Sequence, residues 1–337
     1  MKAVRIWLWV GVLMTLIQVM LGGITRLTNS GLSITEWDVI MGAMPPANEQ
    51  EWMEAFEQYK QFPEYNLENA EMDLAGFKKI FFWEYMHRNW ARLISIVFLI
   101  PFLIFLFQKR LSKIWVRRLL FVFVLGGLQG LMGWIMVASG LIDKPWVSPY
   151  NLTMHLFLAL AIYIYLLWLI FISYKKDIEA DHPVANKRIK WILGIILLQI
   201  IFGGFMAGTK AGMVFNTWPL MHGKILPDGM SSHSNFLSNI FDNTATINFI
   251  HRTLAIVLAI SIFFFWYNNR KYSTHFIHRL TNYLLVIVLI QFTLGVLTLI
   301  NGANGIPIAL GVAHQLTAFI LVGVCVSVLY FSKRRVV

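Results

Sequence analysis

The chain has 337 residues, of which 58% are hydrophobic and only 13% charged, with a formal net charge of +11. A water-soluble domain of this length could not leave so apolar a composition on its surface, so we expect an integral membrane protein. The single cysteine, Cys325, excludes an intrachain disulfide, a CxxC redox pair and a cysteine zinc site, so redox chemistry would need a cofactor.

Apolar runs long enough to cross a bilayer, about 20 residues each, recur along the whole chain. The first has a short basic flank and no small-residue cleavage site, so we interpret it as a retained helix and not as a signal peptide. The sequence therefore predicts an all-α membrane protein with eight spans. They lie at about 7–24, 84–107, 117–139, 152–174, 189–208, 245–267, 280–300 and 310–331.

Basic residues gather in alternate loops and at both ends of the chain, where five segments hold 18 of the 28 Lys and Arg residues. By the positive-inside rule, both termini should be cytoplasmic. The charge is therefore topological and does not indicate a nucleic-acid partner. The opposite loops, which carry few basic residues for their length, are 25–83, 140–151, 209–244 and 301–309.

An internal repeat divides the chain into two halves. Shifted by 181 positions, the first span and its outer loop match the fifth span and its loop, and the offset falls to 164, 162 and 159 further along. Because four spans separate equivalent points, both halves should cross the membrane in the same sense, as parallel repeats. We expect two tandem four-helix bundles, residues 1–175 and 176–337. The identities at the first offset are Gln18/Gln199, Gly22/Gly203, Gly23/Gly204, Thr28/Thr209, Gly31/Gly212, Trp37/Trp218, Gly42/Gly223 and Pro46/Pro227.

Four histidines lie near the outer ends of the even-numbered spans: His87, His155, His251 and His314. The repeat relates the first pair to the second. Ionisable residues inside a membrane are costly and usually mark function. For a lone histidine a helix–helix hydrogen bond would be the simpler interpretation, but two matched pairs predict two sites in which two imidazoles face each other across a haem.

Arginines accompany these histidines. Arg88 follows His87 and Arg252 follows His251, and a guanidinium in the bilayer needs an anion. Haem propionates supply one and favour planar, bidentate partners. Arg88 and Arg252 are therefore candidate haem-binding residues, with Arg26 and Arg92 as further candidates.

Glu84 precedes His87 by three positions, so on a helix the two lie one turn apart on nearly the same face. It could simply be a solvated charge in the first turn of a helix. The second half has Asn248 at the equivalent position. Because only one half carries the acid, we expect the two sites to differ in task, with the chemistry in the first half.

Other features carry weaker signals. Gln-x-x-x-Gly opens the outer part of each odd-numbered span, where close helix packing is a simpler explanation than cofactor contact. Residues 50–59 should form a short helix that lies on the membrane surface or caps the first half. His222 and His233 fall in the outer loop between the fifth and sixth spans, and the solvated histidines are His182, His275 and His278.

The longest motif runs from Gly22 to Trp37 (GGITRLTNSGLSITEW) and is followed by Pro45-Pro46 and by Glu84 to Arg88 (EYMHR). It resembles the haem A synthase family in its mitochondrial and proteobacterial form, and the likeness covers essentially the whole chain. Some members of that family carry a cysteine pair in the first outer loop. This chain has none, which excludes any mechanism that needs the pair.

The resemblance implies oxidation of the C8 methyl group of haem O to a formyl group, giving haem A for cytochrome c oxidase assembly. It also implies that His87 and His155 hold the substrate or product haem, that Glu84 is the catalytic acid, and that His251 and His314 ligate a haem b. The implied partners are haem O synthase, cytochrome c oxidase assembly factors and an unidentified electron donor.

The residues alone leave two other functions open. A di-haem b-type cytochrome would only move electrons, and Glu84 would then be incidental. A transporter built on parallel repeats would explain the topology but not the four paired imidazoles.

Overall fold

The computed structural model describes residues 1–35, 44–140, 145–174, 186–270 and 275–332. Within these ranges every regular element is a helix, apart from one isolated bridge between Met221 and Lys224. Eight helices are long and apolar enough to cross a membrane, which confirms the predicted all-α protein with eight candidate spans. They are α1 (Lys2–Leu27), α4 (Leu74–Phe107), α5 (Lys113–Gly140), α6 (Pro149–Ser173), α7 (Asn186–Gly208), α10 (Thr244–Asn269), α11 (His275–Ile300) and α12 (Ile308–Phe331).

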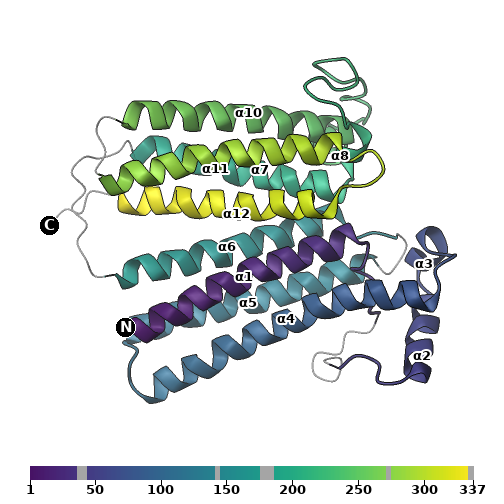
Figure 1. Ribbon diagram of the computed structural model, residues 1–337, viewed down its shortest axis with the longest axis horizontal. Coiled ribbons are helices and arrows are strands. Elements are labelled where there is room, and N and C mark those ends of the chain that lie inside the picture. Colours follow the sequence, from purple (N-terminus) through teal and green to yellow (C-terminus); the bar gives the residue numbers. More distant parts are fainter. Residues whose placement is uncertain (36–43, 141–144, 175–185, 271–274, 333–337) are drawn as a thin grey trace. The chain divides into compact units, whose positions relative to one another are not determined.

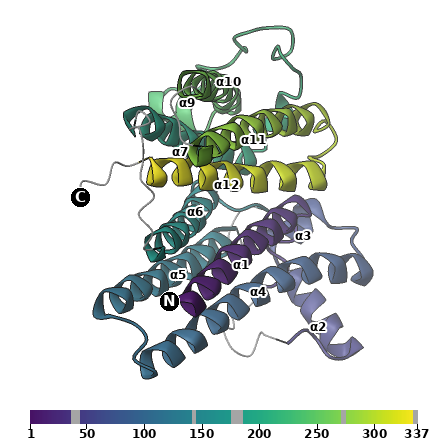
Figure 2. The same ribbon diagram turned by 60° about the vertical axis from the view of Figure 1, so that its left-hand side comes forward.

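The chain forms two compact units, residues 1–163 and 164–337, whose boundary falls inside α6. The expected boundary between residues 175 and 176 lies outside the described residues. In the N-terminal unit α1 packs along α4. In the C-terminal unit α7 packs against α10 and α12, and α11 packs against α10 and α12 (Figure 2).

Helix α4 starts ten residues earlier than the predicted span at 84–107. Its 34 residues correspond to about 50 Å, well beyond the ~30 Å hydrocarbon core of a bilayer. Asp73 caps the start, where its side chain accepts a 2.7 Å hydrogen bond from the Gly76 amide. The hydropathy pattern hid this extension because Lys78 and Lys79 interrupt the apolar run.

The predicted short helix in the first outer loop is present as α2 (Glu49–Tyr59), and a second one, α3 (Pro63–Glu68), follows it. Both lie beside the N-terminal end of α4 (Figure 1). Trp52 packs edge-on against Phe81 with ring centroids 4.9 Å apart, and Phe56 stacks on Phe77 at 5.1 Å. The apolar face of α2 therefore covers the extension of α4, as expected for a cap on the first half.

The C-terminal unit has its own short outer helices, α8 (Ala211–Val214) and α9 (Phe236–Phe241). Ile247 of α10 is fully buried against Phe202 and Phe205 of α7. Cys325 of α12 is buried and free. The last part of α6 joins this unit, where Trp168 meets Tyr330 of α12 at 5.0 Å.

Candidate functional site

The first predicted pair of histidines, His87 on α4 and His155 on α6, comes together in the N-terminal unit, where a charge on one imidazole would act on the other. Each ring lies against a glycine of the preceding membrane helix. A Cβ added to Gly22 of α1 would stand 3.1 Å from His87 Nε2. One added to Gly133 of α5 would stand 3.0 Å from His155 Cε1. We call this pair the first site.

The second predicted pair, His251 on α10 and His314 on α12, comes together in the C-terminal unit in the same way. A Cβ on Gly203 of α7 would stand 3.3 Å from His251 Cε1. On Gly295 of α11 it would stand 2.8 Å from His314 Cε1, closer than real contacts allow. We call this pair the second site.

The Gln-x-x-x-Gly motif is explained by these histidines. Gln129 and Gln199 place their amide Nε2 3.3 Å from Nε2 of His155 and His251 respectively. Gln291 Nε2 lies 3.2 Å from His314 Nδ1. These contacts are helix packing, as the sequence favoured. The partner of each of these three glutamines is the histidine of the next membrane helix along the chain.

Gln18 is different, because its Nε2 donates to the backbone carbonyl of His87 at 3.1 Å and not to the imidazole. Sequence reasoning did not find the pairing of glutamine with histidine. The shared spacing was visible, but which side chain each glutamine meets depends on how the helices pack.

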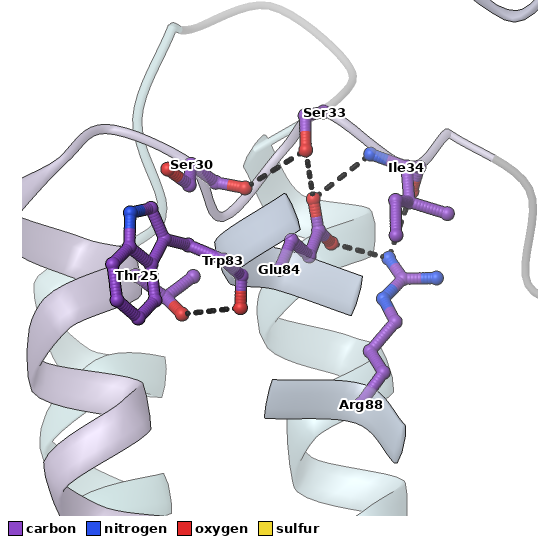
Figure 3. A network of polar contacts seen from close by, with 7 residues as sticks. All are labelled: Thr25, Ser30, Ser33, Ile34, Trp83, Glu84 and Arg88. Carbon is purple, nitrogen blue, oxygen red and sulfur yellow. Dashed lines mark hydrogen bonds and ion pairs between the residues drawn. The ribbon is translucent and has the colours of Figure 1, made fainter. Parts of the chain in front are cut away.

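Glu84 lies deep inside α4, ten positions after its first residue, and is 2% exposed. The interpretation of Glu84 as a solvated charge in the first turn of a helix is therefore wrong. Its Oε2 accepts 2.8 Å hydrogen bonds from the Ser33 hydroxyl and the Ile34 amide, and its Oε1 accepts one of 2.6 Å from Arg88 (Figure 3).

The segment after α1 is shaped to reach this carboxylate. Helix α1 ends at Leu27, and Asn29 adopts a left-handed φ of +49°, which asparagine tolerates better than most residues. The chain then returns over α4, where the Arg88 guanidinium also donates to the Ile34 carbonyl at 2.8 Å. Glu36 and Trp37, at the end of the motif, lie outside the described residues.

The Ser33 hydroxyl has one hydrogen and two acceptors within reach, Glu84 Oε2 at 2.8 Å and the Ser30 carbonyl at 3.0 Å. If Ser33 donates to Ser30, its oxygen is free to accept a hydrogen from Glu84. The same geometry therefore accommodates the Glu84 carboxyl group with or without a proton. No spacing pattern in the sequence pointed to Ser33.

Asn248 occupies the place of Glu84 in the C-terminal unit and also holds the loop after the preceding helix, but with opposite polarity. Its Nδ2 donates to the Ala211 carbonyl at 2.9 Å and to the Phe215 carbonyl at 3.4 Å. The carboxylate accepts hydrogen bonds from its loop, whereas the amide donates them. Each side chain thus fastens an outer loop to a membrane helix.

Arg252 donates to Asn248 Oδ1 at 2.6 Å and to the carbonyls of Phe215 and Thr217 at 2.6 and 2.7 Å. These acceptors are all neutral, whereas Arg88 faces the carboxylate of Glu84. Both arginines that the sequence assigned to haem propionates therefore have protein partners. The charge of Arg88 is balanced by Glu84, whereas the neutral acceptors around Arg252 do not balance its charge. Of the further candidates, Arg26 lies in the last turn of α1 and Arg92 donates to Asn89.

The remaining histidines lie outside the two sites. His222 packs on the Phe215 ring with centroids 5.2 Å apart, and His233 contacts the Ser238 hydroxyl at 3.0 Å. His233 lines a cavity of about 350 Å³ in the outer loops of the C-terminal unit. His182 lies outside the described residues, and His275 and His278 stand in the first turn of α11.

A family comparison matches residues 5–326 to the COX15-CtaA family, described as cytochrome oxidase assembly protein. The Heme A synthase of Flavobacterium psychrophilum is 42% identical, covering 98% of this chain and 99% of the relative. Those of Flavobacterium johnsoniae and Paramagnetospirillum magneticum are each 40% identical, covering 95% and 99% of this chain and 95% of each relative. The chain belongs to the haem A synthase family. This membership confirms the resemblance carried by the motifs and the predicted class of membrane enzyme.

Proposed function

We propose that this haem A synthase oxidises the C8 methyl group of haem O to a formyl group, giving haem A for cytochrome c oxidase assembly. The observation that carries the assignment of the chemistry to the first site is the buried Glu84 carboxylate, one helical turn from His87. The second site has Asn248 at that position and so lacks an acid there.

His87 and His155 hold the substrate haem O or the product haem A, and His251 and His314 ligate a haem b. Unpartnered buried atoms fit this assignment: within the described residues, Nδ1 of His155 and of His251 has no hydrogen-bond partner. The same is true of Oε1 of all four motif glutamines. A histidine that binds a metal through one ring nitrogen normally donates the other N–H to an acceptor. Exchanging the nitrogen and oxygen of the Gln129 or Gln199 amide would bring Oε1 to the ring in that role. A bound haem b supplies one-electron redox chemistry.

Conversion of a methyl group to a formyl group removes four electrons and releases protons, through two hydroxylations to a geminal diol that loses water. Glu84 is the group at the first site that can take or give these protons. Its contact with the Ser33 hydroxyl persists in either protonation state, since that hydroxyl can donate or accept. Arg88 orients the carboxylate through its 2.6 Å ion pair.

The proposed arrangement is two tandem, parallel four-helix halves, residues 1–175 and 176–337. Matched contacts support it. Ile34 and Phe215 stand 181 positions apart, and the carbonyl of each accepts from the arginine that follows the first histidine of its site. Asn29 and Lys210 stand at the same offset, and both have a left-handed φ, of +49° and +55°.

We place the protein in a bacterial inner membrane with both termini cytoplasmic, on the strength of the alternating basic segments. Several of those basic residues lie outside the described ranges. Haem O synthase, oxidase assembly factors and an electron donor are the proposed partners, since substrate, product and electrons must each be exchanged.

Pigment extraction from the purified protein tests this function. Haem O or haem A beside haem b is the expected result. Haem b alone, with no conversion of added haem O, would favour the di-haem electron-transfer cytochrome.

A further inference from the structure

We propose that Gln129, Gln199 and Gln291 are positioning residues that fix the imidazoles of His155, His251 and His314, and that His87 is the ligand free to turn away from the haem iron. The inference rests on the proposed ligation by the four histidines. It goes further by ranking the four ligands by how firmly the protein holds each ring.

Three rings have a side-chain partner. The amides of Gln129 and Gln199 lie 3.3 Å from the ring nitrogens of His155 and His251, and Gln291 lies 3.2 Å from that of His314. His314 Nδ1 also lies 3.1 Å from the backbone carbonyl of Gln291. Exchanging the nitrogen and oxygen of each amide, which occupy equivalent positions, lets Oε1 accept from the ring N–H, and a contact of that kind fixes both the tautomer and the plane of a ligating imidazole.

The fourth ring is held differently. Gln18 donates one of its two amide hydrogens to the His87 backbone carbonyl, so it fastens α1 to α4 and makes no hydrogen bond to the ring. Within the described part of the chain, the His87 imidazole makes no hydrogen bond. Equivalent positions in the motif thus perform two different tasks.

The difference matters because a haem held by two histidines has no open iron position. Loss of a partner that orients a metal ligand typically lowers affinity by about 10- to 100-fold. A ring that lacks such a partner is therefore the one that leaves most readily. His87 is also the ligand one turn from Glu84, so its departure would open the haem beside the proposed acid.

The ranking can be tested by measuring carbon monoxide binding to the reduced, haem-loaded full-length protein through changes in absorbance. We expect wild-type protein to bind it at the first-site haem and not at the second. Gln199→Leu should open the second-site haem, raising its affinity by about tenfold or more. Gln199→Glu keeps an acceptor oxygen, so its second-site haem should bind carbon monoxide as weakly as that of the wild type. This result would show that position 199 tolerates substitution without loss of the fold.

The first site offers a matched pair. Gln129→Leu should raise carbon monoxide affinity and change the low-spin electron paramagnetic resonance spectrum, whereas Gln18→Leu should change neither. His87→Ala should keep the first-site haem on His155, and His155→Ala should lose it. Equal effects of the two glutamine variants, or retention of haem by His155→Ala with loss in His87→Ala, would overturn the inference.

A different result would show that the histidines proposed as haem ligands are wrong. If His251→Ala and His314→Ala keep a full complement of haem b with unchanged spectra, the assigned ligands are wrong. If those variants lose haem b while Gln199→Leu leaves the second-site spectrum and carbon monoxide binding unchanged, only the positioning role fails.

Discussion

Glu84 and Asn248 differ by one group, yet they bond to their outer loops with opposite polarity. The carboxylate accepts from Ser33 and Ile34, and the amide donates to Ala211 and Phe215. Fastening a loop to a helix thus requires only a polar side chain of suitable length. A buried acid at one of two positions that the sequence repeat aligns needs another reason, and the proposed proton transfer would supply it.

We therefore expect Glu84→Gln to lower haem A formation by about 100-fold, the usual scale for a general acid or base. Haem O or a partly oxidised intermediate should accumulate, which chromatography of extracted haems would detect. The new side chain has only one acceptor oxygen, so either the Ile34 N–H faces an NH2 group or another donor loses its acceptor. Either loss should lower the free energy of unfolding by about 1–3 kcal/mol.

Asn248→Asp is the matched control. Under the proposed assignment it should not create a second active site, because that site would bind a different haem. Wild-type haem A output from Glu84→Gln would mean that the carboxylate only fastens the loop.

Ser33→Ala should reduce haem A formation by about tenfold, since a hydrogen bond to a charged group is worth about 1.5–3 kcal/mol. Ser30→Ala is the control, because Ser30 contributes only its backbone carbonyl to this contact. The haem content of both variants should match that of the wild type. A similar loss of activity in the two variants would show that the turn matters and the Ser33 hydroxyl does not.

At the scale of elements, α2 and α3 are fastened to the extension of α4 around a buried phenol. Tyr59 donates to Glu64 at 3.1 Å and accepts from Asn69 at 2.8 Å. Burial, with a further contribution from the Glu64 charge, raises the pKa of Tyr59. The unfolded tyrosine ionises near pH 10, whereas the folded one stays protonated at that pH.

The α2–α4 packing should therefore lose stability as the pH rises above about 10, because only the unfolded state then releases the proton. Below that pH both states are protonated and Tyr59 contributes no pH dependence. The fluorescence of Trp52, which packs on Phe81, would follow the transition against denaturant at each pH. Tyr59→Phe should remove this pH dependence of stability. If the variant loses stability above about pH 10 as the wild type does, another group causes the loss.

Helix α5 offers a paired test of the glycine contacts. A Cβ at Gly133 would stand 3.0 Å from His155, whereas one at Gly130 would meet nothing within 4 Å. Gly133→Ala should therefore displace the imidazole and weaken first-site haem binding by about 10-fold or more, while Gly130→Ala should leave it unchanged. Absorbance titration with haem measures both, and equal affinities would argue against a space requirement.

At the scale of the whole molecule, the eight spans and the alternating basic segments predict one topology. Asn69 follows α3 in the first outer loop, and Lys113 begins α5. Reporter fusions after these two residues should report opposite sides of the membrane, with Lys113 cytoplasmic. Finding both fusions on the same side would contradict the eight-span topology.

Hydropathy determined the eight candidate spans because a bilayer imposes a minimum apolar length on any helix that crosses it. It could not locate the start of α4, since that end is stabilised by Asp73 and by aromatic contacts with α2, which the linear pattern does not contain. The histidines and the Gln-x-x-x-Gly spacing were likewise visible in the sequence, because both recur at fixed offsets.

The tertiary structure alone decided which groups meet. Gln18 and Gln129 have the same spacing to a glycine four positions later, yet of these two only Gln129 contacts an imidazole. The sequence allowed Glu84 to be a solvated charge in the first turn of a helix, but the side chain is buried against a loop 50 positions earlier in the chain. Periodicity encodes which face of a helix a residue occupies, whereas a hydrogen bond depends on the relative placement of two elements, which is set by packing.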